Sequence, residues 1–213
     1  MGRRTLGKIR HDFDLRNHYF ELKALPAPLG DEPFEKRQPL EVEVGSGKGL
    51  FIHTAAAAQP THNFLGIEIA SNYAKFAAAQ LAKHELSNAA MVYGDGIELF
   101  ANHLTSGQVK TVHVYFPDPW WKRRHRKRRI MNEKFLQLVE SRLKIGGKLH
   151  FWTDVQEYFD LSLKLIADVT TFEGPIGVPE KHPDHDFDYR THFERRMRQH
   201  NEPIYRSEFK KVA

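Results

Sequence analysis

The sequence predicts an α/β fold with a mostly parallel central sheet, helices on both faces and an antiparallel C-terminal strand. Three observations support this prediction. Short apolar segments of strand length alternate with segments of helical period between residues 40 and 169. Residues 204–209 alternate weakly between apolar and polar, as an exposed closing strand does. The chain has 213 residues, 40% of them hydrophobic, which suits one compact domain with one core.

Each expected element follows from its own pattern. Strands are expected at residues 40–44, 64–69, 89–93, 109–116 and 148–153, and helices at residues 50–58, 72–86, 97–104 and 155–169. Asn132 is expected to cap a further helix, which should end at Gly146 and Gly147. Repeated strand–helix units imply parallel strands with right-handed crossovers. Ligands should therefore bind at the carboxyl ends of the strands.

Residues 1–38 contain four prolines and no sustained period, so we expect an N-terminal arm or cover before a single domain at 39–213. No apolar run approaches the roughly 20 residues of a membrane span, and the N-terminus lacks a signal-peptide core, so we expect a soluble, cytoplasmic protein. The chain has no cysteine, which excludes disulfides, thiolate-bound zinc and a thiol nucleophile.

The positive charge is concentrated in one segment. The chain has 32 Lys and Arg against 27 Asp and Glu, and seven of the basic residues lie at 122–129. Without this octet, 25 basic residues would face 27 acidic ones, so the octet accounts for the whole basic excess. Aromatic residues and prolines at 115–121 precede it directly. Cations beside aromatic rings favour binding of RNA, although a basic run alone is also typical of a solvated loop.

A glycine-rich turn follows the first expected strand, with Glu43 before it and Gly45, Gly47 and Gly49 within it. A P-loop would need a glycine where Val42 stands and a hydroxyl where Gly49 stands, so it is excluded. A dinucleotide site would need the spacing G-x-G-x-x-G, and the alternate glycines weaken that interpretation. The third candidate ligand is S-adenosylmethionine, which needs backbone room and carboxylates rather than a phosphate cradle.

Three successive strand ends carry an acid: Glu43, Glu68 and Asp95. Glu68 stands at about the separation where an acid meets a ribose diol, and Asp95 is placed to accept from an adenine amino group. Each acid has a plain structural explanation: Glu43 facing solvent, Glu68 near a helix start, and Asp95 within a Gly-Asp-Gly turn. Taken together, the three acids favour S-adenosylmethionine as the cofactor.

The fourth strand end carries Asp118 between two prolines and beside Trp120, so a planar base could meet one fixed acceptor there. From about residue 40 to 209, the chain resembles the bacterial single-subunit tRNA (guanine-N7)-methyltransferases. The resemblance implies a class I S-adenosylmethionine-dependent, Rossmann-like methyltransferase fold. The motifs that carry it are residues 43–49, 64–68, 116–125, 127–129, 151–154, 191–194 and 203–206.

The resemblance implies a role for each motif. Asp118 would be catalytic and would also line the cofactor site with Glu43, Gly45, Gly47, Glu68 and Asp95. The guanine would meet Lys122, Asp154, Thr191, His192, Phe193 and Glu194; family members usually carry Lys where His192 stands. The tRNA would meet Arg124, His125, Arg126, Lys127, Arg128 and Arg129. The resemblance implies tRNA as the partner, with no membrane, no metal and no obligate protein partner.

The implied reaction is methylation of N7 of a guanine in the tRNA variable loop. N7 carries a lone pair and no proton, so the work is positioning and electrostatic stabilisation. Asp118 would either stabilise the developing purine cation or accept hydrogen bonds from the base. Because N7 lies in a deep, narrow groove of A-form RNA, we expect the target base to be flipped or already in irregular structure.

Alternatives remain at this point. Asp154 and Thr191 both have the spacing of helix caps. A cluster of His and Asp residues has side chains that can bind a metal, but a solvated loop explains it better. Its members are His182, Asp184, His185, Asp186 and Asp188. Rival functions are an RNA-binding protein without catalysis, a methyltransferase acting on an exocyclic amine, and an NAD-dependent oxidoreductase.

Overall fold

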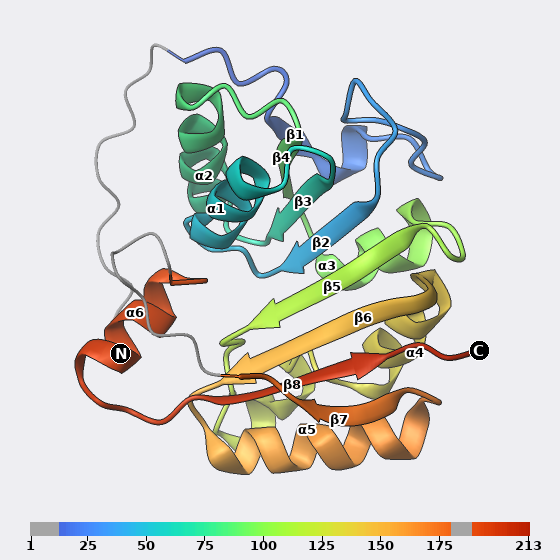
Figure 1. Ribbon diagram of the computed structural model, residues 1–213, viewed down its shortest axis with the longest axis vertical. Coiled ribbons are helices and arrows are strands. Elements are labelled where there is room, and N and C mark those ends of the chain that lie inside the picture. Colours follow the sequence, from blue (N-terminus) through green and yellow to red (C-terminus); the bar gives the residue numbers. More distant parts are fainter. Residues whose placement is uncertain (1–12, 180–188) are drawn as a thin grey trace.

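Figure 1 shows the computed structural model, which describes residues 13–179 and 189–213. Within these residues, eight strands form one sheet in the order β1-β4-β3-β2-β5-β6-β8-β7. The strands are β1 (Tyr19–Glu21), β2 (Leu40–Val44), β3 (Asn63–Glu68), β4 (Ala89–Tyr93), β5 (Val109–Tyr115), β6 (Leu143–Thr153), β7 (Glu173–Gly177) and β8 (Tyr205–Lys210). Strands β1 to β6 pair in parallel, β8 is antiparallel to β6, and β7 is antiparallel to β8. The predicted mostly parallel sheet with an antiparallel C-terminal strand is confirmed.

Helices cover both faces of the sheet because successive strand side chains point to opposite sides. The helices are α1 (Leu50–Ala58), α2 (Ser71–Lys83), α3 (Gly96–Glu98), α4 (Glu133–Arg142), α5 (Gln156–Val169) and α6 (His192–Gln199). On one face, Phe64 of β3 packs with Phe51 of α1 and Leu81 of α2. On the other face, Val114 of β5 belongs to the cluster that contains Phe135 of α4. The core is therefore two apolar layers separated by the sheet.

The carboxyl ends of β2 to β6 lie at one edge of the sheet, because these five strands are parallel. The segments that leave this edge are residues 45–49, 69–70, 94–95, 116–122 and 154–155. In Figure 1, α6 lies on the side toward which the arrowheads of β5 and β6 point. The topology thus gathers all four predicted strand-end acids and α6 at one edge.

The described part of the N-terminal segment packs against the domain. β1 pairs with β4, with Tyr19 opposite Met91. Leu22, Leu29 and Phe34 are buried in the main core cluster. No strand is expected here from sequence, since three residues are too few to show a period. The boundary at residue 38 stays a prediction.

The helix expected after Asn132 begins as predicted but ends earlier than the sequence indicated. Asn132 does cap α4, accepting from the N–H of Phe135 at 3.0 Å. The predicted helix end at Gly146 and Gly147 is wrong, because α4 ends at Arg142 and both glycines lie in β6. The register between β5 and β6 shifts after the pair Val109 and Leu143. Residues 144–147 therefore form an irregularity in β6, in which Gly146 has a φ angle of 77°.

Residues 96–103 form the short helix α3 followed by a π-helical turn, η2 (Leu99–His103), rather than one regular helix. Strand β7 was not expected from the sequence. Its residues include Gly174 and Pro175, which are unusual within a strand. It lies at the open edge of the sheet beside β8, where a proline is tolerated.

Candidate functional site

The turn after β2 has a left-handed backbone with open space beside it. Gly45, Gly47 and Gly49 have φ angles of 81°, 54° and 74°, which residues with a side chain adopt only at a cost. A Cβ on Gly45 or Gly47 would meet no described atom within 4 Å, whereas one on Gly49 would lie 2.6 Å from Cβ of Ala77. Gly49 therefore allows close packing of α1 on α2, and Gly45 and Gly47 leave room for a ligand.

Glu68, the last residue of β3, holds this turn in place. Its carboxylate oxygens accept hydrogen bonds from the backbone N–H of Gly47 and of Ala70, each at 2.9 Å. The side chain is buried, so the bonds tie together the turns after β2 and β3. A carboxylate has about four lone-pair positions, so both oxygens keep capacity for a ligand hydroxyl. The ribose contact of Glu68 stays a prediction.

Glu43 is a buried carboxyl with an unpaired oxygen. Its side chain is on the same face of β2 as Glu41, it is 2% exposed, and Oε2 has no hydrogen-bond partner within the described part of the chain. Burial raises the pKa of Glu43 to about 8, and the charge of the nearby Glu68 contributes in the same direction. A buried carboxylate is costly unless a cation pairs with it. Glu43 is therefore prepared to receive a positively charged group.

These features fit the S-adenosylmethionine predicted from the sequence. The open turn at Gly45 and Gly47 provides backbone room, and Glu43 provides an uncompensated acid for a cationic group. Glu68 anchors the turn between them. The donor set contains carboxylates and backbone groups of the kind that the cofactor needs, so the residues present are compatible with it.

Asp95 caps the short helix α3. Its Oδ1 accepts from the backbone N–H of Ile97 at 2.7 Å and of Glu98 at 3.3 Å. The side chain is exposed at the carboxyl end of β4. The turn explanation from sequence therefore holds, and it is compatible with a ligand contact through the other oxygen. The adenine contact stays a prediction.

Asp118 lies in a loop with an unusual backbone. The residues on either side of its two prolines, Phe116 and Trp120, have φ angles of 49° and 43°. Left-handed conformations at bulky residues cost of the order of 1–3 kcal/mol each and are concentrated at functional sites. The Asp118 side chain is exposed at the carboxyl end of β5. The loop therefore holds an exposed carboxylate after β5, the strand that neighbours β2 and its glycine turn.

Arg129 holds this loop from behind. Its Nε donates to the carbonyl of Pro119 at 2.7 Å. Its guanidinium lies 4.8 Å from the centroid of the Tyr158 ring in α5. Burial raises the pKa of Tyr158 to about 12, so the ring stays neutral. Arg129 was predicted to contact tRNA; that contact stays a prediction, and the structure adds a role in positioning the loop of Asp118.

The rest of the basic octet forms an exposed 3₁₀ helix, η3 (Arg123–Arg128). Lys122 precedes it and is exposed. Within the helix, Arg124 donates from Nε to Nε2 of His125 at 3.2 Å, and Arg128 lies 5.1 Å from the Trp120 ring centroid. Arg126 and Lys127 are both exposed. The predicted RNA-binding residues thus form one cationic surface next to Asp118.

Helix α6 brings the predicted guanine-binding segment to the same edge. Thr191 caps it, accepting from the N–H of Glu194 at 3.0 Å. Glu194 is buried, and its carboxylate accepts from the N–H of Arg190 at 2.7 Å and from Nε of Arg198 at 3.0 Å. The capping prediction for Thr191 is confirmed. A role of Glu194 toward the guanine stays a prediction, beside its structural role in the helix start.

Phe193 joins α6 to the loop of Asp118. Its ring lies 4.8 Å from that of Phe116, and the guanidinium of Arg196 lies 4.7 Å from the ring centroid of Phe193. The charge of Arg196 also acts on Asp154 at the end of β6. His192 is exposed at the first turn of the helix. The ends of β5 and β6 and the start of α6 therefore converge.

Asp154 does not cap α5. The N-cap is Val155, which makes no side-chain cap, and the N–H of Val155 donates instead to Oγ1 of Thr153 at 3.3 Å. The capping explanation for Asp154 is therefore wrong, because the helix begins one residue later than its spacing implied. Burial raises the pKa of Asp154. Its half-buried carboxyl is left for a ligand contact.

Three polar residues near this edge of the sheet were not identified from the sequence: His113, Tyr115 and Arg190. His113 and Tyr115 alternate with Val112 and Val114 along β5, a period-2 pattern that places them on the face shared with Glu43. Arg190, just before α6, donates from Nη1 to the hydroxyl of Tyr115 at 3.4 Å. The alternation in β5 was a usable signal. The sequence held no comparable signal for Arg190.

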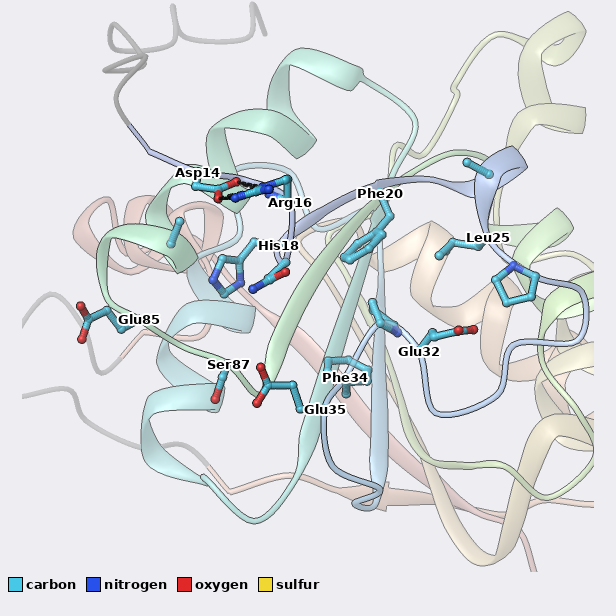
Figure 2. Close-up of a pocket in the computed structure, with 15 residues that line it drawn as sticks. Asp14, Arg16, His18, Phe20, Leu25, Glu32, Phe34, Glu35, Glu85 and Ser87 are labelled. Carbon is cyan, nitrogen blue, oxygen red and sulfur yellow. Dashed lines mark hydrogen bonds and ion pairs between the residues drawn. The ribbon is translucent and has the colours of Figure 1, made fainter.

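A cavity of about 690 Å³ lies elsewhere (Figure 2). Residues of the N-terminal segment such as His18, Phe20 and Glu32 line it, together with the end of α2 and residues after it. None of its lining residues belongs to the candidate site. The cluster at His182 to Asp188 falls outside the described residues, and residues 13–179 and 189–213 contain no group of three or more potential metal ligands.

The chain is similar to known methyltransferases. A family model described as "Putative methyltransferase" matches residues 37–207. A tRNA (guanine-N(7)-)-methyltransferase of Rhodopirellula baltica is 46% identical over 99% of this chain and 80% of its own length. The protein of the same name from Pediococcus pentosaceus is 36% identical over 83% of this chain and 83% of its own length.

Solved structures show the same fold. The aminoglycoside resistance methyltransferase NpmB1 is similar with a TM-score of 0.55 and 17% identity, covering 84% of this chain and 89% of that one. A 30S ribosomal A1408 methyltransferase from an uncultured bacterium has a TM-score of 0.52 and 19% identity, with the same coverages of 84% and 89%. The predicted class I methyltransferase fold is confirmed. No described helix is long and apolar enough to cross a membrane.

Proposed function

Because the chain belongs to the tRNA (guanine-N(7)-)-methyltransferase family, we propose that it methylates its guanine over the loop of Asp118, beside the glycine turn. S-adenosylmethionine is the methyl donor, and N7 of a guanine in tRNA is the acceptor. The observation that carries the proposal is the exposed Asp118 held between two left-handed residues at the carboxyl end of β5. We further propose that the target is the variable-loop guanine and that the enzyme works in the cytoplasm.

The cofactor supplies an electrophilic methyl group on a sulfonium centre. The chain's residues bind and orient the two reactants. Gly45 and Gly47 leave room at the turn, Glu43 offers a carboxyl to a cationic group, and Glu68 fixes the turn. Guanine N7 has no proton to lose, so no general base is required. Holding N7 at a reactive distance of about 3–3.5 Å removes a large part of the entropic barrier.

Asp118 faces the guanine in this proposal. Positive charge moves onto the purine as its N7 is methylated, and a fixed carboxylate nearby stabilises that charge. The same carboxylate accepts hydrogen bonds from the N1–H and amino group of the base if the base is turned the other way. The bond from Arg129 to Pro119 keeps the loop in place, so the carboxylate needs little reorganisation. Asp154 offers a second acceptor at the next strand end.

The cationic surface at η3 delivers the RNA. Seven Lys and Arg within residues 122–129 neutralise backbone phosphate and release counterions. The surface directly adjoins Asp118, so phosphates bound there place a flipped nucleotide at the carboxylate. Trp121 is 57% exposed beside this surface and offers a face on which an unpaired base can stack.

The proposal is tested with the variant Asp118→Asn and the matched control Asp160→Asn, an exposed aspartate on α5. Each is incubated with bulk tRNA and labelled S-adenosylmethionine, and the nucleosides are analysed for 7-methylguanosine. We expect Asp118→Asn to lose about 100-fold or more in kcat at saturating cofactor. The control should keep the wild-type rate.

Full activity in Asp118→Asn at saturating cofactor would refute the central role of Asp118. The nucleoside analysis separates the rivals. A non-catalytic RNA-binding protein would transfer no label, and an exocyclic-amine methyltransferase would label a different nucleoside. Binding of nicotinamide cofactor in place of S-adenosylmethionine would indicate the oxidoreductase.

A further inference from the structure

Arg190 occupies a defined position at the start of α6. Its backbone N–H donates to Oε2 of Glu194 at 2.7 Å, so its main chain is part of the helix start. Its guanidinium lies 5.6 Å from the ring centroid of Phe51, 5.5 Å from that of Trp152 and 6.0 Å from that of Tyr115. Three aromatic rings from α1, β5 and β6 therefore lie near a half-buried cation.

A chain of hydrogen bonds that begins at Glu41 orients the guanidinium of Arg190. His113 lies 2.7 Å from Glu41 through Nε2 and 2.9 Å from the Tyr115 hydroxyl through Nδ1. Burial lowers the pKa of His113, so its ring is neutral near pH 7. Since a carboxylate only accepts, Nε2 carries the proton and Nδ1 accepts from Tyr115. The Tyr115 oxygen is then free to accept from Arg190, at 3.4 Å.

Most donors of Arg190 remain unused. A guanidinium has five N–H donors, and the bond to Tyr115 is its only side-chain hydrogen bond among residues 13–179 and 189–213. It forms no ion pair with a carboxylate in that part of the chain. Cations held in apolar surroundings normally find an anion, because burial without one is costly. Arg190 therefore has room for an anionic ligand.

Glu43 has a carboxyl oxygen, Oε2, without a partner in the described residues, just as Arg190 has unused N–H donors. In the register of β2 and β5, Glu43 stands opposite His113. His113 is two residues before Tyr115, so Glu43 and Tyr115 lie on the same face of the sheet. Glu43 and Arg190 are not bonded to each other, although the positive charge of Arg190 acts to lower the pKa of Glu43. An unpaired carboxyl and an underused guanidinium thus flank Tyr115 beside the glycine turn.

We infer that Arg190 binds the carboxylate of the cofactor's amino-acid end while Glu43 receives its ammonium group. This inference rests on the proposed function and adds a residue to it. An α-amino acid zwitterion carries one anion and one cation about one carbon apart, and it is the part of the cofactor that needs both an acid and a base. Phosphate of tRNA is a poorer match, because Arg190 is half-buried within the aromatic cage, whereas η3 offers exposed cations.

The consequence is selectivity for a donor with an intact carboxylate. Arg190 acts as a binding residue for the cofactor and has no part in the transfer itself. Tyr115, His113 and Glu41 are positioning residues, since they set the direction of the Arg190 hydrogen bond. Removing the guanidinium should weaken binding of the cofactor mainly through the lost contact with its carboxylate.

The test is a comparison of two ligands by titration calorimetry without tRNA: S-adenosylmethionine and its decarboxylated analogue, which keeps the ammonium and sulfonium groups. The wild type should bind the intact cofactor roughly 10- to 100-fold more tightly than the analogue. Arg190→Met should lose about that factor for the intact cofactor and stay within about threefold for the analogue. Arg37→Met, which removes an exposed surface charge, is the control and should change neither.

Each result decides a separate point. If Arg190→Met weakens both ligands equally, or changes neither, the inference is overturned and Arg190 only supports the fold. If Arg190→Met does not fold, Arg190→Lys keeps the charge without the planar fork, and it should narrow the ratio of the two affinities. An unchanged ratio in Arg190→Lys then overturns the inference. Failure of the wild type to bind S-adenosylmethionine would instead contradict the proposed function.

Discussion

Replacing Glu43 with Gln should make the cofactor-free protein more stable at alkaline pH. The Glu43 carboxyl is buried, one of its oxygens has no partner in the part of the chain that the structure describes, and burial raises its pKa from 4.5 to about 8. The folded state therefore holds this proton between about pH 4.5 and pH 8, where the unfolded state has lost it. The stabilisation from the proton is complete below about pH 4.5 and is lost as pH rises through 8. Glutamine is neutral throughout and has no such loss.

The size of the effect follows from the pKa difference. At about 1.4 kcal/mol for each pH unit, the rise from 4.5 to about 8 corresponds to about 5 kcal/mol when Glu43 is fully ionised. About 2 kcal/mol of this falls between pH 6 and pH 8. The free energy of unfolding of Glu43→Gln minus that of the wild type should therefore increase by about 2 kcal/mol over this interval.

Urea denaturation followed by tryptophan fluorescence measures this difference at a series of pH values. The titration of other groups, including the 13 histidines, largely cancels between variant and wild type. Glu41→Gln is the matched control, two residues earlier on the same face of β2. Burial of Glu41 opposes its ionisation, but the hydrogen bonds with His113 and His62 more than offset this and lower its pKa. Glu41→Gln should therefore show no gain in stability toward alkaline pH.

A difference between Glu43→Gln and the wild type that stays constant from pH 6 to pH 8 would refute this reasoning. It would mean that the folded and unfolded states bind the Glu43 proton equally, so burial does not control this carboxyl. Saturating S-adenosylmethionine should also reduce the slope in the wild type, because a cationic ligand favours the ionised form.

Two further predictions concern the glycine turn and the cationic surface. Gly49→Ala should lower the free energy of unfolding by about 2–4 kcal/mol, because its Cβ would lie 2.6 Å from that of Ala77 at a positive φ. Gly47→Ala has open space, so it should cost only about 1 kcal/mol in stability and act mainly on cofactor affinity in a calorimetric titration; equal stability losses would contradict this. Neutralising Arg126 and Lys127 together should weaken tRNA binding and reduce the slope of log K against log salt by about 1.5. Filter binding at several salt concentrations measures it, and an unchanged slope would remove these two side chains from the RNA contact.

Much of the fold could be predicted because strand and helix periods are local properties. The prediction of the end of α4 failed because one apolar residue fits both the helical period and the start of a strand. Leu143 continues the helical repeat of Leu136 and Val139, and it is also buried as the first residue of β6. Only the pairing with Val109 of β5 decides between the two, and that contact is not visible in the local sequence.

The strand-end acids were predictable because parallel strands bring their carboxyl ends to one edge. Their hydrogen-bonding states were not, since these depend on which backbone groups approach in space. Glu68 accepts from two backbone N–H groups, although the sequence indicated only a ribose contact or a place near a helix start. Asp154 caps nothing, although its spacing indicated a helix cap. Arg190 escaped prediction because its partners come from α1, β5 and β6, far apart in the chain.

Glu41 and Glu43 illustrate how the structure separates residues that a sequence makes equivalent. Both lie in the run Glu-Val-Glu-Val, point to the same face of β2 and are buried. Glu41 meets two histidines, each at 2.7 Å, and its charge is stabilised within the protein. Oε2 of Glu43 has no such partner among residues 13–179 and 189–213, and burial of Glu43 makes its charged state costly. Of these two acids, it is therefore Glu43, next to the open turn, whose ionisation is costly. A cationic ligand bound there lowers this cost. Ligand binding and the alkaline loss of stability should thus be linked through Glu43, whereas Glu41 should contribute no alkaline loss of stability.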